Sequence, residues 1–259
     1  MDHVCFPFYA SIHHTSSAKK LSLSGFVQMV ELPRIGPKET APAITPYNAQ
    51  GKTKLHAIEA PYHAIVVDHD HDDMTAEGIQ QIYDPYNMSY LAFTTSSHKL
   101  PGKGNRWKVL IPLACSVPHD QWIEIATGAT LKANADKAQA RTCQVFYAPN
   151  ILDENAIYES LNKTDLPFLD VSDIHHSFVS DCFNAYQKNE ARKDQIALSA
   201  KPMPRNFNGA GTIIEQINKS FSLSDVLMSH GYQSKKGKYL SPTSESLSPG
   251  VKILDDSRC

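Results

Sequence analysis

The stretch His63-Ala64-Ile65-Val66-Val67-Asp68-His69-Asp70 decides the fold, because it joins an apolar run directly to two carboxylates. The run from Ala64 to Val67 is short and nearly continuous, which predicts a buried strand. Side chains at positions i and i+2 of a strand point to the same face. We therefore expect Asp68 and Asp70 to lie together where this strand ends.

Further elements are expected on both sides of this strand. On its C-terminal side they are a helix over 75–83 with Thr75 as N-cap, strands over 89–96 and 106–113, a helix that opens at Pro118, and a strand over 143–147. Pro112 predicts that the strand over 106–113 ends there or lies at a sheet edge. On the N-terminal side a short helix over 24–30 precedes a loop over 33–54, which is rich in Pro, Gly, Thr and Lys.

The C-terminal third of the chain has a different pattern. Apolar residues at helical spacing predict an amphipathic helix that runs from Ile174 toward Leu198. A linker over 201–206 and one or two short helices over 213–230 follow. The chain is therefore predicted to be α+β, with a catalytic domain over 1–165 and a smaller helical region over 166–259.

The composition excludes several classes of protein. Hydrophobic residues make up 41% and charged residues 20% of the 259 residues, which is typical of a globular protein and not of a disordered or fibrous one. No stretch reaches the ~20 apolar residues of a membrane span, and the start lacks the pattern of a signal peptide. The five cysteines are scattered and never form a CxxC pair. We therefore expect a reducing, cytoplasmic location without membrane contact.

Two more pairs with i, i+2 spacing follow the acidic pair, each on a predicted strand. Ser96 and His98 end the second strand, and Arg106 and Lys108 begin the third. If the three strands are neighbours, one sheet face carries two carboxylates, a hydroxyl, an imidazole and two cations. Such carboxylates suit a hard divalent ion, and the cations suit a triphosphate. Together they predict a two-metal phosphoryl-transfer site.

The order of these motifs resembles the archaeo-eukaryotic primase superfamily, in the primase-polymerase branch of phages and plasmids. The resemblance rests on VVDHD (66–70), the strand leading into TTSSH (94–98), NRWKVLIPL (105–113), and Asp136 in the segment NADKAQARTCQVFYAPN that ends at Asn150. It covers about residues 60–150 well and the first 60 only loosely. The tail from His230 is similar to a segment that follows the primase domain, before the helicase, in phage primase-helicases.

The resemblance implies an RRM-like catalytic sheet and a role for each matching residue. Asp68, Asp70 and Asp136 would hold two Mg²⁺ or Mn²⁺ ions, while Asp120 and Asp153 are possible substitutes for Asp136. Ser96 and His98 would contact the phosphates of the incoming nucleoside triphosphate. Arg106 and Lys108 match a basic pair that is more often two arginines, so that Lys108 keeps the charge but loses the bidentate fork.

The predicted function is primer synthesis or extension on a single-stranded DNA template, in phage, plasmid or mobile-element replication, with a helicase as possible partner. Lysines at two places are candidate DNA contacts: Lys99, Lys103, Lys235, Lys236 and Lys238. Two alternatives stay open. One is a non-catalytic module that holds DNA or docks a helicase. The other is a zinc hydrolase that uses His69 and His71 of the HDHDD segment.

Overall fold

The computed structural model describes residues 4–17, 19–70, 73–199, 222–235, 237–242 and 249–253. The chain divides into two compact units, Met1–Ala197 and Leu198–Cys259. This boundary lies later than the one expected at 165/166, because Phe178, Val179 and Cys182 are buried in the core of the first unit. The predicted linker over 201–206 lies outside the described residues.

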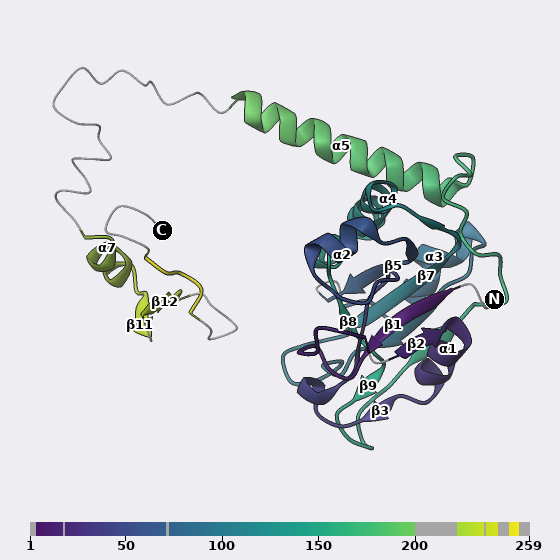
Figure 1. Cartoon of the computed structure of the whole chain (residues 1–259), viewed down its shortest axis with the longest axis horizontal. Coiled ribbons are helices and arrows are strands. Elements are labelled where there is room, and N and C mark those ends of the chain that lie inside the picture. Colours follow the sequence, from purple (N-terminus) through teal and green to yellow (C-terminus); the bar gives the residue numbers. More distant parts are fainter. Residues whose placement is uncertain are drawn as a thin grey trace. The chain divides into compact units, whose positions relative to one another are not determined.

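A four-stranded antiparallel sheet forms the centre of the first unit (Figure 1). Its strands, in spatial order, are β10 (Ser160–Asn162), β6 (Leu91–Thr94), β7 (Trp107–Val117) and β5 (Tyr62–His69). Because β5 and β6 both run antiparallel to β7, they are parallel to each other, and helix α3 (Ala76–Tyr83) connects them. This is a split β-α-β unit with the third strand between the first two, and β10 adds at the β6 edge.

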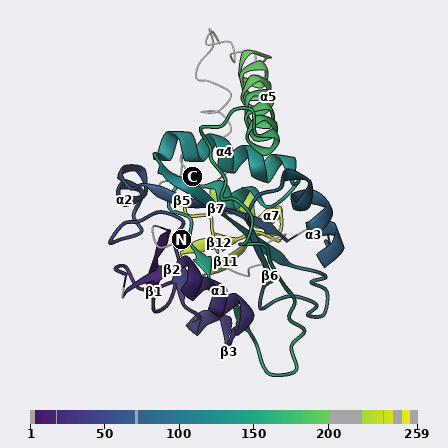
Figure 2. The same cartoon turned by 90° about the vertical axis from the view of Figure 1, so that its right-hand side faces the viewer.

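Helices cover one face of this central sheet (Figure 2). They are α2 (Lys54–Glu59), α3, α4 (His119–Lys132) and α5 (Ser177–Ser199). The odd-numbered residues of β5 and β7 pack against them, among them Ile65, Val67 and Trp107. Thr75 caps α3 through its hydroxyl, which accepts a hydrogen bond from the Gly78 amide, as the sequence predicted. Since helices lie on an antiparallel sheet, the α+β prediction is confirmed.

A second four-stranded sheet and helix α1 (Leu23–Glu31) cover the opposite face. This small sheet has the order β2 (Lys19–Ser22), β1 (Cys5–Tyr9), β4 (Ala43–Ile44) and β8 (Phe146–Tyr147). Phe26 of α1 makes edge-to-face contacts with Phe93 of the central sheet and Phe146 of the small sheet, with ring centroids 5.8 and 6.1 Å apart. Such contacts stabilise the packing beyond simple burial and hold the two sheets together.

Three sequence expectations about strands are wrong. The loop over 33–54 contains β3 (Arg34–Ile35), the 3₁₀ helix η1 (Lys38–Thr40) and β4, and β3 pairs in parallel with β9 (Asn150–Ile151). The strands expected over 89–96 and 143–147 are shorter, at four and two residues. Pro112 neither ends β7 nor lies at an edge: β6 is too short to reach it, and its carbonyl accepts a hydrogen bond from the Leu169 amide instead.

The described part of the second unit is not only helical. Helix α7 (Leu223–Ser229) ends before Gly231, whose φ of +83° suits a glycine. The strands β11 (Gln233–Lys235) and β12 (Lys238–Leu240) then form an antiparallel pair. In the described part of the chain, no helix has both the length and the apolar character that a membrane crossing requires.

Helices α4 and α5 touch at a glycine. A Cβ added to Gly128 would lie 2.1 Å from the carbonyl oxygen of Cys182, a distance that no packing adjustment of a side chain relieves. Although Gly→Ala normally stabilises a helix interior, we predict that Gly128→Ala lowers the free energy of unfolding by roughly 1–3 kcal/mol through overpacking. Urea denaturation measures the change.

Gly25→Ala, in helix α1 of the same unit, is the matched control, because its added Cβ would meet only side-chain atoms, the nearest being Leu21 Cδ1 at 2.9 Å. A Gly128→Ala variant as stable as this control would show that the two helices are not in backbone contact.

Candidate active site

The register between β5 and β7 brings opposite charges together on one face of the central sheet. Asp68 pairs with Lys108, and the adjacent row pairs His69 with Trp107. Alternation along each strand sends Asp68 and Lys108 toward the small sheet, the face that Val66 and Leu110 share with the apolar interior. The polar site is thus the end of an otherwise apolar face.

Each carboxylate of the acidic pair contacts a cation. The Lys108 ammonium donates a hydrogen bond to Asp68 Oδ2 and lies 3.5 Å from Gln139 Oε1. Arg106 Nη1 lies 3.0 Å from Asp70 Oδ2. The side chains of Lys108 and Asp68 are only 7% and 16% exposed. Because solvent screens such a pair weakly, removing one partner leaves a costly buried charge.

The two carboxylates also face each other. Burial raises the pKa of Asp70 above its usual value, and the neighbouring Asp68 carboxylate raises it further, against the opposing effect of Arg106 and Lys108. Asp68 Oδ1 is buried and has no hydrogen-bond partner in the described part of the chain. A buried carboxylate oxygen without a donor is rare in folded proteins and points to a missing cationic or proton-donating partner.

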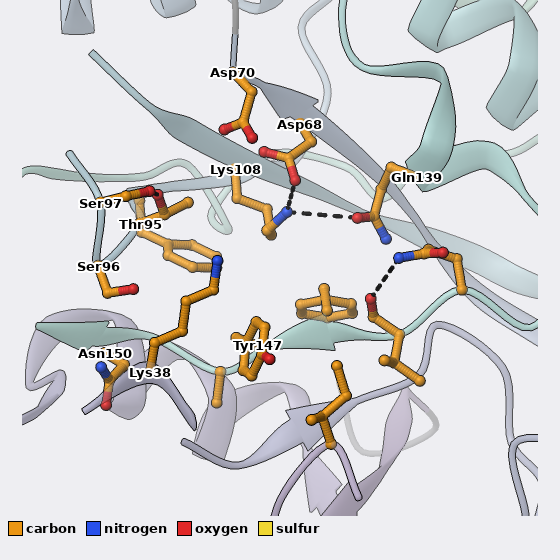
Figure 3. Close-up of a pocket in the computed structure, with 16 residues that line it drawn as sticks. Lys38, Asp68, Asp70, Thr95, Ser96, Ser97, Lys108, Gln139, Tyr147 and Asn150 are labelled. Atoms are coloured by element: carbon orange, nitrogen blue, oxygen red, sulfur yellow. Dashed lines mark hydrogen bonds and ion pairs between the residues drawn. The ribbon is translucent and has the colours of Figure 1, made fainter. Parts of the chain in front are cut away.

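An intersheet cavity of about 170 Å³ opens beside this pair (Figure 3). Asp68, Asp70 and Lys108 line one wall, and the opposite wall comes from η1, β8 and β9. Lys38 extends from that wall into the space below the carboxylates, as Figure 3 shows. Its ammonium lies 5.2 Å from the centroid of the Tyr147 ring, a cation–π contact. The cavity therefore combines two carboxylates with cations from both walls.

Ser96 and His98 do not lie on a strand, contrary to the sequence expectation. Strand β6 ends at Thr94, and residues 95–103 form tight turns in which Lys99 and Gly102 have positive φ. The i, i+2 rule therefore does not apply to this pair. Ser96 still lines the intersheet cavity, and it also lines a second cavity of about 280 Å³ together with His98.

His98 is buried, with a hydrogen bond at one ring nitrogen and a carboxylate near the other. Nδ1 accepts a hydrogen bond from the Arg106 amide at 3.0 Å, and Nε2 lies 3.4 Å from Glu159 Oε1. Burial lowers the pKa of His98 although Glu159 opposes the change. A neutral ring that accepts at Nδ1 carries its proton on Nε2, so His98 fixes the base of the turn that presents Arg106 to Asp70.

The backbone of Asp136, and not its carboxylate, contacts Asp68. Its amide donates a hydrogen bond to the Asp68 carbonyl at 2.8 Å, while its carboxylate accepts one from the Ala138 amide and caps the 3₁₀ helix η3 (Lys137–Ala140). The two substitutes lie elsewhere. Asp120 is exposed in the first turn of α4, and Asp153 lines the second cavity. The described residues contain no cluster of three or more His, Cys, Asp or Glu side chains suited to a metal.

The zinc alternative loses one of its ligands. His69 faces the helices, where Nε2 lies 3.0 Å from the Tyr83 hydroxyl, whereas Asp68 and Asp70 face the cavity. Alternation along β5 therefore separates His69 from the carboxylates, as the strand prediction requires. His71 lies outside the described residues.

The lysines expected to contact DNA have different surroundings. Lys99 pairs with Glu159 at 2.9 Å, and Lys103 is exposed in the turn beside Arg106. Lys235 and Lys238 are exposed and face each other across the β11–β12 pair. Lys236 lies outside the described residues.

Sequence reasoning missed Lys38, Gln139 and Tyr147. Lys38 belongs to the segment interpreted as a loop, and Gln139 follows Asp136 without any strand or helix signal. Tyr147 lies in the segment after Asp136 that the resemblance covers, but the resemblance assigned it no role.

The raised pKa of Asp70 leads to a prediction about stability. Because the folded state binds this proton more tightly, Asp70 contributes stability below its ordinary pKa of 3.8 that is lost as the pH rises through its folded pKa. Asp70→Asn should therefore raise the melting temperature at pH 7, and the gain should vanish below pH 3.8. Thermal melts across roughly pH 3–8 without divalent metal measure it.

Glu159→Gln should show the opposite sign, since Lys99 lowers the pKa of Glu159 and this carboxylate is stabilising at neutral pH. If Asp70→Asn melted below the unsubstituted protein at pH 7, the Arg106 ion pair would outweigh burial and the repulsion from Asp68.

Comparison with known proteins adds two distant likenesses. No protein-family model matches the chain, and no curated protein matches its sequence. The AEP domain of the cyanophage S-2L primase-polymerase is 13% identical, covering 65% of this chain and 86% of its own, with a TM-score of 0.41. The primase RepB′ is 12% identical, covering 75% of this chain and 60% of its own, with a TM-score of 0.38. Both are named as primases.

Proposed function

We propose that the chain is a template-directed nucleotidyltransferase that makes or extends primers on single-stranded DNA. One observation carries the proposal: Asp68 and Asp70 lie side by side at the end of β5, and cations from both walls of one cavity surround them. Paired carboxylates with convergent cations are the groups that phosphoryl transfer requires. Nucleoside triphosphates, a single-stranded template and a replicative helicase are the partners that this function implies.

The acidic pair fits a divalent metal ion. Asp68 Oδ1 is buried without a donor among the described residues, and Asp70 carries a raised pKa that a nearby cation would lower again. Carboxylate oxygens are the ligands that Mg²⁺ and Mn²⁺ prefer, with water and phosphate oxygens completing the shell. Asp68 and Asp70 would hold the ions, and Asp136 is the candidate third carboxylate. Bound ions would supply charge neutralisation at the phosphates and acidify the attacking 3′-hydroxyl.

The cations would bind and orient the triphosphate. Lys38 approaches from η1 on the opposite wall and Lys108 from the central sheet, so phosphates between the walls would meet positive charge on both sides. Without nucleotide, Lys108 pairs with Asp68 and Arg106 with Asp70. Phosphate oxygens would compete with the carboxylates for these two cations. The positive charges of Lys108 and Arg106 are therefore already in the site before the nucleotide binds. On binding its substrate, the site would therefore exchange the Lys108–Asp68 and Arg106–Asp70 ion pairs for contacts with phosphate and metal.

The turn after β6 would provide the remaining phosphate contacts. Ser96 lines the intersheet cavity and offers a hydroxyl. His98 lines the second cavity and not the intersheet one, and its Nδ1 is occupied by the Arg106 amide, so a phosphate would contact it at Nε2, in place of Glu159. We therefore keep His98 as a nucleotide contact and add a positioning role through Arg106.

Removal of the acidic pair tests the function. Asp68→Asn with Asp70→Asn should abolish primer extension with labelled nucleotides on single-stranded DNA, a loss of roughly 10³-fold or more given the weight of charge stabilisation in such reactions. In the unsubstituted protein, Mn²⁺ with a nucleoside triphosphate should raise the melting temperature, because ligands stabilise the state that binds them.

The double variant should lose that melting shift while staying folded. Glu77→Gln, at an exposed position of α3, is the control that should keep both primer extension and the melting shift. Incorporation by the purified double variant would refute the proposal, and binding of DNA without incorporation by the unsubstituted protein would favour a non-catalytic module.

Asp136 permits a test that separates metal binding from helix capping. Asn is as good an N-cap as Asp, so Asp136→Asn should keep η3 and the melting temperature, whereas Asp136→Ala should lose about 1 kcal/mol of stability. If the carboxylate also holds metal, both variants should lose extension activity. Full activity in a stable Asp136→Asn would leave the residue with its capping role alone.

A further inference from the structure

A groove between α4 and α5 lies on the far side of η3 from the intersheet cavity. Its volume is about 500 Å³, and one stripe from each helix lines it. The α5 stripe is Tyr186, Asn189, Glu190 and Lys193, whose spacing of three, one and three places them on one helix face. The segment that follows η3 closes the groove with Arg141.

The groove exists because α4 and α5 are in backbone contact near Gly128 and diverge toward the C-terminal end of α5. At Gly128 the backbone of α4 meets the carbonyl of Cys182, and Cys182 is fully buried. One turn later Tyr186 is half-buried, and Lys193 is exposed. Figures 1 and 2 show α5 running on past the body of the first unit. Polar side chains therefore line a space that the apolar core leaves open.

Positive charge dominates this groove. Lys137 and Arg141 are exposed, and in the described ranges of the chain neither side chain has an ion-pair partner. Lys193 pairs with Glu190 at 2.6 Å, and Glu190 is the one carboxylate among the lining residues described. Three cations thus face one carboxylate in the lining. Burial raises the pKa of Tyr186, and Glu190 and Glu124 of α4 raise it further, so a second carboxylate lies near the ring. Threonine hydroxyls, the Asn189 amide and the Tyr186 ring supply the remaining polar and aromatic surface.

The groove and the intersheet cavity share a wall. From one short segment, Gln139 lines the cavity and contacts Lys108, whereas Lys137 and Arg141 line the groove. The start of the segment is tied to the acidic pair, because the Asp136 amide donates to the Asp68 carbonyl. A ligand bound in the groove would therefore be separated from the acidic pair only by the short helix η3.

We propose that this groove holds the single-stranded DNA template, with phosphates on Lys137, Arg141 and Lys193 and a base against Tyr186. Cations that track a backbone and an aromatic ring for stacking are the two features of single-strand binding sites. The inference rests on the proposed function, which requires a template strand beside the site of nucleotide addition. It locates template binding in the first unit.

Salt-dependent binding tests the groove. Affinity of the full chain for a labelled oligothymidylate is measured by fluorescence anisotropy at several salt concentrations. The triple substitution Lys137→Gln, Arg141→Gln and Lys193→Gln should make the log–log salt slope shallower by about 2, at roughly 0.7 per lost phosphate contact on a single strand. The single Arg141→Gln should change the slope by about 0.7. Tyr186→Ala should weaken binding about tenfold and leave the slope unchanged.

The matched control removes the same charge elsewhere, with Lys19→Gln, Lys20→Gln and Lys54→Gln on exposed positions of β2 and α2. Its slope should equal that of the unsubstituted protein. Equal slopes for both triple variants would overturn the groove as the template site, and so would an unsubstituted protein that does not bind the oligonucleotide.

A second readout separates this inference from the proposed function. The melting shift caused by Mn²⁺ with nucleoside triphosphate should be unchanged in the groove variant, because none of its three substitutions lines the intersheet cavity. Loss of that shift together with DNA binding would overturn the assignment of the groove to template alone. Unaltered DNA binding with an intact shift would overturn the groove and leave the proposed function standing.

Discussion

The antiparallel register of β5 on β7 is the constraint on which the site depends. Asp68 stands opposite Lys108, and the next polar pair, Asp70 and Arg106, meets just beyond the ends of the two strands. A slip of one residue would turn both aspartates toward the helices and bring His69 to the cavity. Burial prevents that slip, since Ile65 and Val67 on the helix side and Val66 on the other are all covered. Burial of the apolar residues of β5 thus fixes the positions of Asp68 and Asp70, which follow them in sequence.

Charge compensation explains how two carboxylates persist on a half-buried face. Lys108 and Arg106 each hold one of them, yet the pKa of Asp70 stays raised and Asp68 Oδ1 stays without a donor in the described part of the chain. The arrangement is therefore stable but under-neutralised, which is the condition a divalent ion relieves. Neutralising Asp70 should therefore favour folding while impairing the proposed activity, a trade-off expected where an active site is preorganised.

The sequence predicted the parts of the site that follow strand periodicity. The strand over 63–68 and the helix that Thr75 caps were found where expected, and alternation correctly put His69 on the face opposite Asp68. Periodicity has no bearing on turns, so it misplaced Ser96 and His98 on a strand and gave no sign of Lys38. Non-local packing decided the rest. Pro112 lies inside β7 because a distant segment, at Leu169, replaces β6 as its neighbour.

The most direct measurement of the central claim is a crystal structure of the protein with Mn²⁺ and a non-hydrolysable nucleoside triphosphate. Anomalous scattering locates the metal independently of the protein density. Our account predicts a manganese peak within coordination distance of Asp68 and Asp70, with the triphosphate between Lys38 and Lys108 and in contact with Ser96. Manganese or triphosphate bound elsewhere, with the Asp68–Lys108 pair undisturbed and the intersheet cavity empty, would contradict it.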